Sequence, residues 1–567
     1  MTHYSSLITK LMLYPDVIFH GGQVLTVDRA FSRAQAVAVQ GERIVAVGDD
    51  ATVLALAGPR TRQVPLRGRT LLPGLIDAHA HMDREGLRGL YPSLAGARSI
   101  ADVQVIVRRA VERARPGEWV VFMPLGEPPY YLDPPAGLAE GRYPDRWDLD
   151  QAAPDNPVYI RAPWGFWSDR PPFVAIANSV ALQRAGVDRD TPAPSSAVTI
   201  ERDAAGEPTG RLLEHNLIPV LEQTLMQAVP RFTPELRLQA LRESQRLYLA
   251  AGTTGIYEGH GVDPVVRQVY KRLWDEGGLR VRSYLAVSPL WTSPADAARD
   301  LLEWGSCAAG PGFGDDWLRV GGLGISPERS RDVAPLLRGA LPYTGWAGFV
   351  EQYWPWADYR EIAWLAARHD VRLNTIASAE VEPLLELWEE IDREIPLAGR
   401  RWVLVHGRVI PPALLPRIRR LGAVVTTIAA THVYRDGLAA VERGEDAEHL
   451  VPHRALEEAG VAWALATDNK PYPLLETLWV ALARAEQREG RIIGPGQRLS
   501  RAQAMRAATA GGAYVCFDER RRGSLEVGKL ADLIVLSGDP LTIDLDAFRD
   551  LRVDLTMVGG QIVHGED

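Results

Sequence analysis

The stretch "LLPGLIDAHAHMD" runs from Leu71 to Asp83. A short apolar run ends in an acid, Asp77, and two histidines follow, His79 and His81. Residues i and i+2 of an extended segment point to the same side, so both imidazoles can reach one metal ion. The simpler interpretation is that they are two unrelated surface histidines in a loop. The rest of the chain distinguishes this interpretation from a metal site.

Beyond this stretch the chain alternates apolar strand-like runs with helical segments, for example at 101–114, 235–252 and 358–370. Such alternation predicts an α/β fold, a (β/α)8 TIM-like barrel with its helices outside. The candidate strands number more than eight, so some must lie outside the barrel or be wrong. They are 71–76, 119–125, 157–161, 253–257, 280–287, 319–325, 371–376, 402–406, 422–427 and 461–466.

Both ends of the chain have a different character, with β-branched alternation and glycine-containing turns. We therefore expect residues 1–70 and 520–567 to form one composite β-sandwich domain. Residues 71–519 would form the barrel. A region rich in Pro, Gly and Asp, at about 126–232, is expected to be a large insertion in it.

The composition narrows the class of protein. The net charge of −9 is spread without long runs of one sign, which argues against nucleic acid or an anionic membrane as a partner. Two cysteines, far apart, exclude a thiolate zinc cluster, so any metal must use His and carboxylate ligands. Without a signal-peptide pattern or a membrane-spanning run, we expect a cytoplasmic protein that acts on a small molecule. The sequence leaves a homodimer open.

Further ligand-type residues follow other predicted strands. His406 ends "WVLVHG", Asp468 follows "VAWALAT", and Glu258 and His260 follow "TTGIY". A lone histidine at a strand end is more often structural than ligating. Several such residues at equivalent places of a barrel indicate a metal site, because barrel enzymes carry their sites at the carboxyl ends of their strands.

Tryptophan-rich segments accompany turn formers at 163–167 ("PWGFW") and 353–359 ("YWPWADY"). Aromatic loops of this kind often line a pocket for an apolar or ring-bearing ligand, although simple packing explains them equally well. On the first interpretation Trp164 is a substrate-binding residue.

The motifs resemble those of the amidohydrolase superfamily, and specifically its amidohydrolase-3 (YtcJ-like) branch. The resemblance rests on "LLPGLIDAHAHMD", "GSLEVGKLADLIVL", and the intervening "ANSVAL", "GEPTGRLLE" and "ATDNKPYPLLETLWVALAR" in the same order. It implies the barrel, a β-sandwich built from both termini, and a divalent metal, zinc with manganese or iron as alternatives. It also implies a hydrolase acting on carbon–nitrogen bonds other than peptide bonds.

The resemblance breaks at two expected metal ligands. Gly324 stands where the family usually has a lysine, and Asn374 stands where it has a histidine. We therefore expect one metal ion per chain. The resemblance places His79, His81 and Asp468 around the metal, with Glu214 as the added carboxylate, while Glu258, His260 and Asn374 remain open as alternatives. His432, Asn374 and Lys470 are expected to contact the substrate.

A divalent ion bound by neutral imidazoles lowers the pKa of a bound water to roughly 7. Asp468 and His406 are the expected catalytic residues: Asp468 moves the proton, and His406 helps to polarise the substrate carbonyl. Asp468 as a simple helix N-cap is the structural alternative. The predicted function is cleavage of a C–N bond in a small amide or cyclic amide with an aromatic or apolar body. The alternatives are a deaminase, a C–C hydrolase or a decarboxylase on the same scaffold, and a non-catalytic binding protein.

Overall fold

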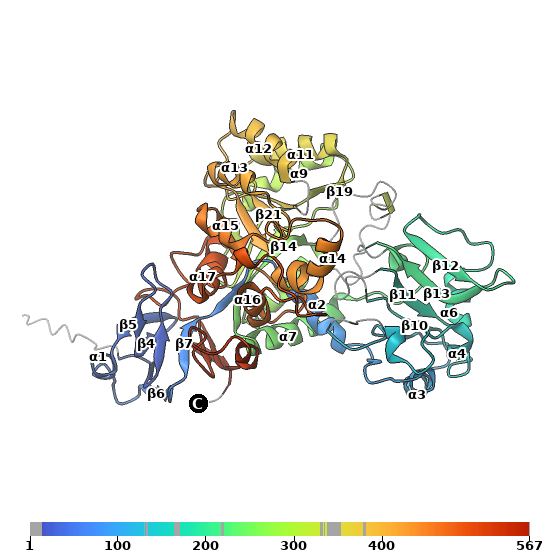
Figure 1. Cartoon of the computed structure of the whole chain (residues 1–567), viewed down its shortest axis with the longest axis horizontal. Coiled ribbons are helices and arrows are strands. Elements are labelled where there is room, and N and C mark those ends of the chain that lie inside the picture. Colours follow the sequence, from blue (N-terminus) through green and yellow to red (C-terminus); the bar gives the residue numbers. More distant parts are fainter. Residues whose placement is uncertain are drawn as a thin grey trace, which may run out of the picture.

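The computed structural model describes residues 14–129, 131, 134–163, 171–216, 220–328, 333, 335–336, 353–377 and 381–565. Within these ranges the chain forms a central barrel, two sheets from the chain ends, and a separate inserted sheet (Figure 1). No helix among the described residues is long and apolar enough to cross a membrane.

Eight parallel strands form the barrel, in sequence order around it. The last strand returns to the first, because the Ala78 amide donates to the Leu465 carbonyl at 3.3 Å. The predicted (β/α)8 barrel is thereby confirmed. Its strands are β8 Leu75–Asp77, β14 Thr253–Val262, β15 Arg282–Val287, β17 Leu318–Gly324, β20 Leu373–Ile376, β21 Val403–Val405, β22 Val424–Thr427 and β23 Ala462–Leu465.

Helices follow the strands and cover the barrel (Figure 1). Their starts are encoded locally: Ser293 and Asp296 form a reciprocal capping box at the start of α9 (Pro294–Ala308). The other helices around the barrel are α7 Pro234–Ala250, α8 Pro264–Asp275, α11 Trp356–Arg368, α12 Val381–Asp392, α13 Leu415–Arg420, α14 Gly437–Glu442, α15 His453–Glu458, α16 Leu474–Ala483, α17 Arg501–Ala507 and α18 Ala510–Val515.

The two surplus strands of the sequence analysis lie outside the barrel. They are β9 (Val120–Phe122) and β10 (Val158–Ile160), which pair in parallel within a five-stranded sheet. This sheet also contains β11 Phe173–Ala177, β12 Val198–Arg202 and β13 Pro208–Glu214, with helices α3 Ile100–Val111, α4 Arg146–Asp150 and α6 Ser179–Ala185 beside it. Periodicity alone could not separate these strands from barrel strands, because both kinds are short, apolar and buried.

Two sheets are built near the chain ends. One contains β5, β4, β1 and β6, and the other joins N-terminal and C-terminal strands in the order β26, β25, β24, β7, β2, β3. The division into domains with the expected bounds stays a prediction. The strands are β1 Val17–His20, β2 Gln23–Leu25, β3 Arg33–Ala34, β4 Ala36–Gln40, β5 Arg43–Gly48, β6 Arg62–Pro65, β7 Thr70–Pro73, β24 Leu533–Leu536, β25 Val553–Val558 and β26 Gln561–His564, with helix α1 Asp50–Leu54.

A buried ion pair links the barrel to the mixed terminal sheet. Arg282 on β15 donates from Nε and Nη2 to the two carboxylate oxygens of Asp532, at 2.7 and 3.0 Å. Both side chains are almost fully buried. The Gly559 amide also donates to Asp532, so the carboxylate holds β15 and the β25–β26 turn together.

We expect Arg282→Met to lower the free energy of unfolding by about 3–5 kcal/mol, because it leaves the Asp532 carboxylate buried without its charged partner. Denaturant unfolding would measure this loss. Arg246→Met is the matched control, since the Arg246–Glu243 pair is exposed and should contribute far less. Equal losses in the two variants would contradict a stabilising role for the buried pair.

Candidate metal centre

The carboxyl end of β8 places His79 and His81 at the centre of the barrel, both completely or almost completely buried. Asp77 fixes this end, because its Oδ1 accepts the His79 amide at 3.1 Å and the Thr467 amide at 3.0 Å. Burial raises the pKa of Asp77 to about 7, although the hydrogen bonds from Thr467 oppose this shift. Asp77 therefore joins the ends of β8 and β23 through Thr467, which lies 390 residues after it in the sequence.

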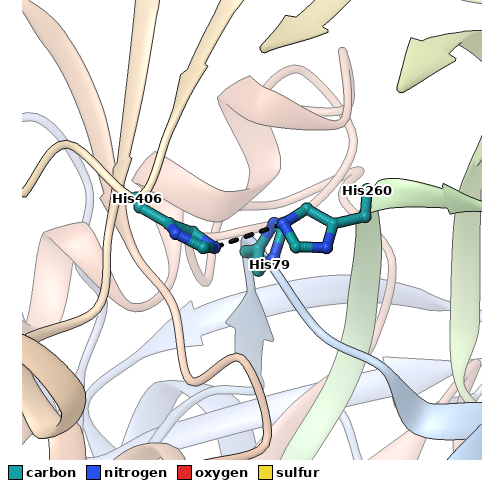
Figure 2. Close-up of side chains that lie close together, drawn as sticks. All are labelled: His79, His260 and His406. Carbon is teal, nitrogen blue, oxygen red and sulfur yellow. Dashed lines mark hydrogen bonds between the residues drawn. The ribbon is translucent and has the colours of Figure 1, made fainter. Parts of the chain in front are cut away.

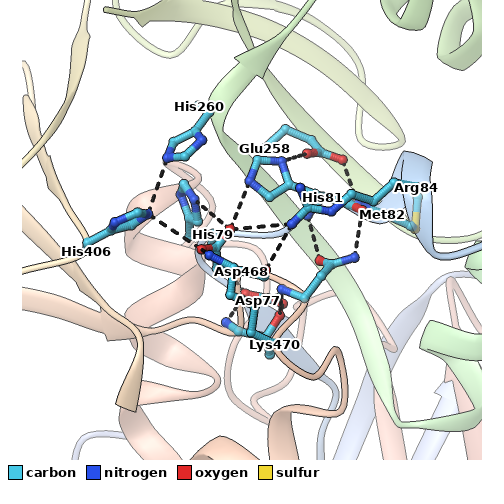
Figure 3. Close-up of polar contacts among 12 residues, drawn as sticks. Asp77, His79, His81, Met82, Arg84, Glu258, His260, His406, Asp468 and Lys470 are labelled. Carbon is cyan, nitrogen blue, oxygen red and sulfur yellow. Dashed lines mark hydrogen bonds and ion pairs between the residues drawn. The ribbon is translucent and has the colours of Figure 1, made fainter. Parts of the chain in front are cut away.

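Asp468 follows β23 and lies against the histidines (Figure 3). Its Oδ1 is 3.1 Å from Nε2 of His81 and 3.6 Å from Nε2 of His79. Its Oδ2 is 3.7 Å from Nε2 of His406. The first and last strands of the barrel thus bring together the ligand types that the sequence predicted there.

Three residues of this region have left-handed backbone conformations: His406 (φ 74°), Asp468 (φ 51°) and Asn469 (φ 56°). Such conformations are uncommon for residues other than glycine and cluster at functional sites, where surrounding contacts hold them. Asp468 is not a helix N-cap, because α16 begins at Leu474 with Pro473 in the cap position. The structural alternative for Asp468 was therefore wrong.

Asn469 was not among the residues that the sequence predicted for the site. Its Oδ1 accepts the His81 amide at 2.8 Å and the Tyr248 hydroxyl at 2.6 Å, while its Nδ2 donates to the His81 carbonyl at 2.7 Å and to Glu85 at 2.8 Å. Asn469 thereby holds the backbone of His81 beside Asp468. The available signal was its place next to Asp468, because asparagine tolerates left-handed backbone better than most residues.

Two more imidazoles complete the cluster, His406 after β21 and His260 within β14 (Figure 2). Their Nε2 atoms lie 3.2 Å apart. The ring of His79 lies 4.5 Å from that of His260 and 5.1 Å from that of His406, measured between centroids. His260, one of the open alternatives of the sequence analysis, therefore belongs to the cluster.

Charge and burial set the protonation of these groups. Burial lowers the pKa of His79, His81, His260 and His406, so the imidazoles are neutral at pH 7. Burial alone would raise the pKa of Asp468, but the Lys470 ammonium, 2.5 Å from Oδ2, and the neighbouring rings of His79 and His81 hold it well below its usual range. The site combines neutral imidazoles with an ionised carboxylate.

These donors suit a divalent ion. Two sets of three mutually close ligand atoms overlap at His79: one adds His81 and Asp468, and the other adds His260 and His406. Both ring nitrogens of His79 are buried and form no hydrogen bond with described residues. Neutral imidazole and carboxylate are the ligands that zinc accepts, and a bound ion would satisfy nitrogens that are otherwise costly to bury.

Glu258, on β14, lies against the Nδ1 side of the His81 ring. Its Oε2 lies 3.4 Å from Nδ1 of His81, and its Oε1 accepts the Met82 amide and the Tyr270 hydroxyl at 3.0 and 2.6 Å. Metal-binding histidines commonly have a carboxylate on their second nitrogen, which fixes the ring orientation. Nε2 of His81 is left facing Asp468.

One predicted site residue, Glu214, is not in the cluster. Among the described residues, no set of mutually close ligand atoms contains Glu214. Its Oε1 accepts hydrogen bonds from the backbone amides of Val220 and Leu221. The metal-ligand role of Glu214 stays a prediction that these contacts do not support. Trp164 lies outside the described residues.

Two other predicted substrate residues, His432 and Lys470, lie beside the cluster. The ring centroid of His432 is 5.8 Å from that of His406, and Lys470 contacts Asp468. Asn374 is held inside the barrel, accepting the Tyr257 hydroxyl and donating to the Leu323 carbonyl at 3.0 Å. In the second aromatic segment Trp354 is buried in the core, so this residue packs rather than lines an open pocket.

The chain is similar to known proteins over nearly its whole length. The chain is 27% identical to an N-substituted formamide deformylase of Arthrobacter pascens, over 96% of this chain and 97% of that protein. It is 26% identical to the putative amidohydrolase YtcJ of Bacillus subtilis, over 96% of this chain and 99% of that protein. Both likenesses span the terminal sheets, the barrel and the insertion.

A metal-dependent hydrolase of Pyrococcus furiosus has a similar fold, with a TM-score of 0.66 and 20% sequence identity over 93% of this chain and 100% of that one. The model of the amidohydrolase family matches residues 63–564, nearly the whole chain. The chain therefore belongs to the amidohydrolase family and is a hydrolase that acts on carbon–nitrogen bonds.

Proposed function

We propose that this enzyme hydrolyses the C–N bond of a small amide, with a single divalent ion held by His79, His81 and Asp468 and with His406 beside it. The observation that carries the proposal is the meeting of these side chains, 3.1–3.7 Å from Asp468 to each imidazole, where β8, β21 and β23 end. Zinc is the expected metal, because the donors are imidazole nitrogens and a carboxylate.

The ion would supply an activated water, by lowering the pKa of that water to roughly 7. The protein supplies the proton transfer. Asp468 is ionised and central, so one of its carboxylate oxygens can take the proton from the attacking water and deliver it to the leaving nitrogen. Lys470 keeps Asp468 ionised before the attack.

His432 is placed to assist at the substrate carbonyl. Its Nε2 is buried and forms no hydrogen bond with described residues, and burial keeps the pKa of its ring well below the usual value. In the Nε2–H tautomer a neutral imidazole donates a hydrogen bond without adding charge. Such a donor stabilises the oxygen on which negative charge develops during the attack.

The substrate class follows from the relative and from the burial of the site. The name of the Arthrobacter pascens relative states N-substituted formamides, in which a minimal acyl group is joined to a nitrogen with a larger substituent. We extend this class to small amides and cyclic amides with an apolar or aromatic body. The test is release of the amine and the acid from such amides, followed by chromatography. Carbon dioxide release instead would identify a decarboxylase, and ammonia from a ring amine would identify a deaminase.

We expect one equivalent of metal per chain after dialysis. Gly324 carries no side chain, and Asn374 is engaged with Tyr257 and Leu323. Of the three sets of close ligand atoms, two share His79 and therefore describe a single centre. The third set is His81, Asp83 and Glu258, in which Glu258 lies against Nδ1 of His81. Elemental analysis would measure the content, with chelator-treated protein as the control. Two tightly held equivalents would contradict the proposal of a single ion.

A further inference from the structure

β14 is longer than the other barrel strands and reaches into the proposed metal site. It has ten residues, Thr253–Val262, and its register against β15 shifts between Glu258 and Val262. His260 lies in this irregular part and faces His406 from across the barrel (Figure 2). A β-bulge of this kind redirects a side chain next to a functional site.

Two glycines make this arrangement possible. Gly324 leaves room for the backbone of β14, and Gly259 leaves room for the ring of His79. A Cβ atom at Gly324, on β17, would lie 1.9 Å from the His260 carbonyl oxygen, so the backbone of β14 occupies the place of a side chain there. A Cβ atom at Gly259 would lie 2.0 Å from Nδ1 of His79. No side chain fits at either position without moving His260 or His79.

The spacing between His260 and His406 matches that of two ligands of one ion. Two imidazole nitrogens that bind a tetrahedral zinc ion at about 2.1 Å lie about 3.4 Å apart. The observed Nε2–Nε2 distance is 3.2 Å. A direct hydrogen bond between the two rings has a similar length, so the packing of the rings distinguishes the two arrangements.

Packing favours the ligand role. The His260 ring lies 4.5, 5.0 and 5.2 Å from the rings of His79, His81 and His406, so it contacts every other imidazole of the cluster. With His79 and His406 it forms a complete set of three ligand atoms. A histidine that served only packing would not need its Nε2 aimed at the same point as the others.

We propose that His260 is a ligand of the catalytic metal. Gly324 leaves room for the backbone of β14, and Gly259 leaves room for the His79 ring, so β14 can bring this ligand into the site. The inference rests on the proposed metal centre. It adds a ligand from the second barrel strand to those from the first, sixth and eighth strands.

The test is metal binding by the full-length protein, measured by elemental analysis after dialysis, chelator competition with zinc, and the absorption spectrum of the cobalt-substituted protein. His260→Asn is expected to weaken zinc binding by more than the roughly 10- to 100-fold typical of an outer-shell partner. It should also change the cobalt spectrum, because one nitrogen donor is lost. His432→Asn is the matched control: its ring is also near His406, and zinc affinity and cobalt spectrum should stay close to those of the wild type.

Gly324→Ala provides an independent variant in which every histidine remains. Its methyl group should displace the His260 backbone and weaken zinc binding, whereas Gly137→Ala, where a Cβ meets nothing within 4 Å, should not. If wild-type protein binds zinc and both His260→Asn and Gly324→Ala keep its affinity and spectrum, the ligand role of His260 is wrong while the metal centre stands. If wild-type protein binds no metal, the proposed function falls as well.

Discussion

The Asp468→Asn variant, assayed with zinc in excess so that its metal site is filled, should lose roughly 10²- to 10⁴-fold in kcat while its fold persists, because an amide cannot take the proton that Asp468 takes. Asparagine has nearly the same shape, and it tolerates the left-handed backbone observed here at φ 51°. Its carbonyl oxygen can still accept a hydrogen bond from Lys470. The fall in rate would therefore report proton transfer rather than unfolding.

The measurement combines turnover of an amide substrate, bound metal and the thermal midpoint of unfolding. Asp518→Asn is a matched control, since Asp518 is also mostly buried and ion-paired, with Arg319 and Arg522, but contacts none of the clustered histidines in the described contacts. That variant should lose stability and keep its activity per folded molecule. Near-normal turnover of Asp468→Asn would refute the proton-transfer role, whereas loss of metal together with rate would show that Asp468 is mainly a ligand.

His79→Ala should remove both the metal and the activity. His79 belongs to two of the three sets of close ligand atoms, the two that contain Asp468 or His406, so its loss breaks both of these. Removing even an outer-shell partner costs about 10- to 100-fold in metal affinity, and removing a central ligand should cost more. Dialysed His79→Ala should contain almost no metal, and its rate should rise again when zinc is added in excess.

The matched control is His453→Ala. His453 is fully buried like His79, stacks on Trp463 with centroids 5.0 Å apart and bonds to Thr427, outside the cluster. This variant should lower the free energy of unfolding and keep its metal. Full metal content in His79→Ala would contradict the assignment of His79, and equal metal loss in the two variants would point to general destabilisation.

Local patterns in the sequence were sufficient to predict the fold class and the site residues that follow the first and the last barrel strand. Strand–helix alternation predicted the barrel, because each strand and helix carries its own periodicity. His79 and His81 were recognised from their spacing of two, and Asp468 from its place directly after an apolar strand. Each of these features involves only residues that are close together in the chain, so a single sequence is enough to recognise it.

Contacts between distant segments were not predictable in the same way. In the sequence, Gly324 looked like the loss of a ligand. In the folded chain, its missing side chain leaves room for the backbone of β14, which brings His260 to His406. Asn469 was overlooked because its partner, His81, is 388 residues away. Glu214 looked like a ligand, and its contacts are with nearby backbone amides. The bulge in β14 and the order of the strands around the barrel decide which of these residues meet. Both depend on how separate strands pair, so neither produces a periodic pattern in the sequence.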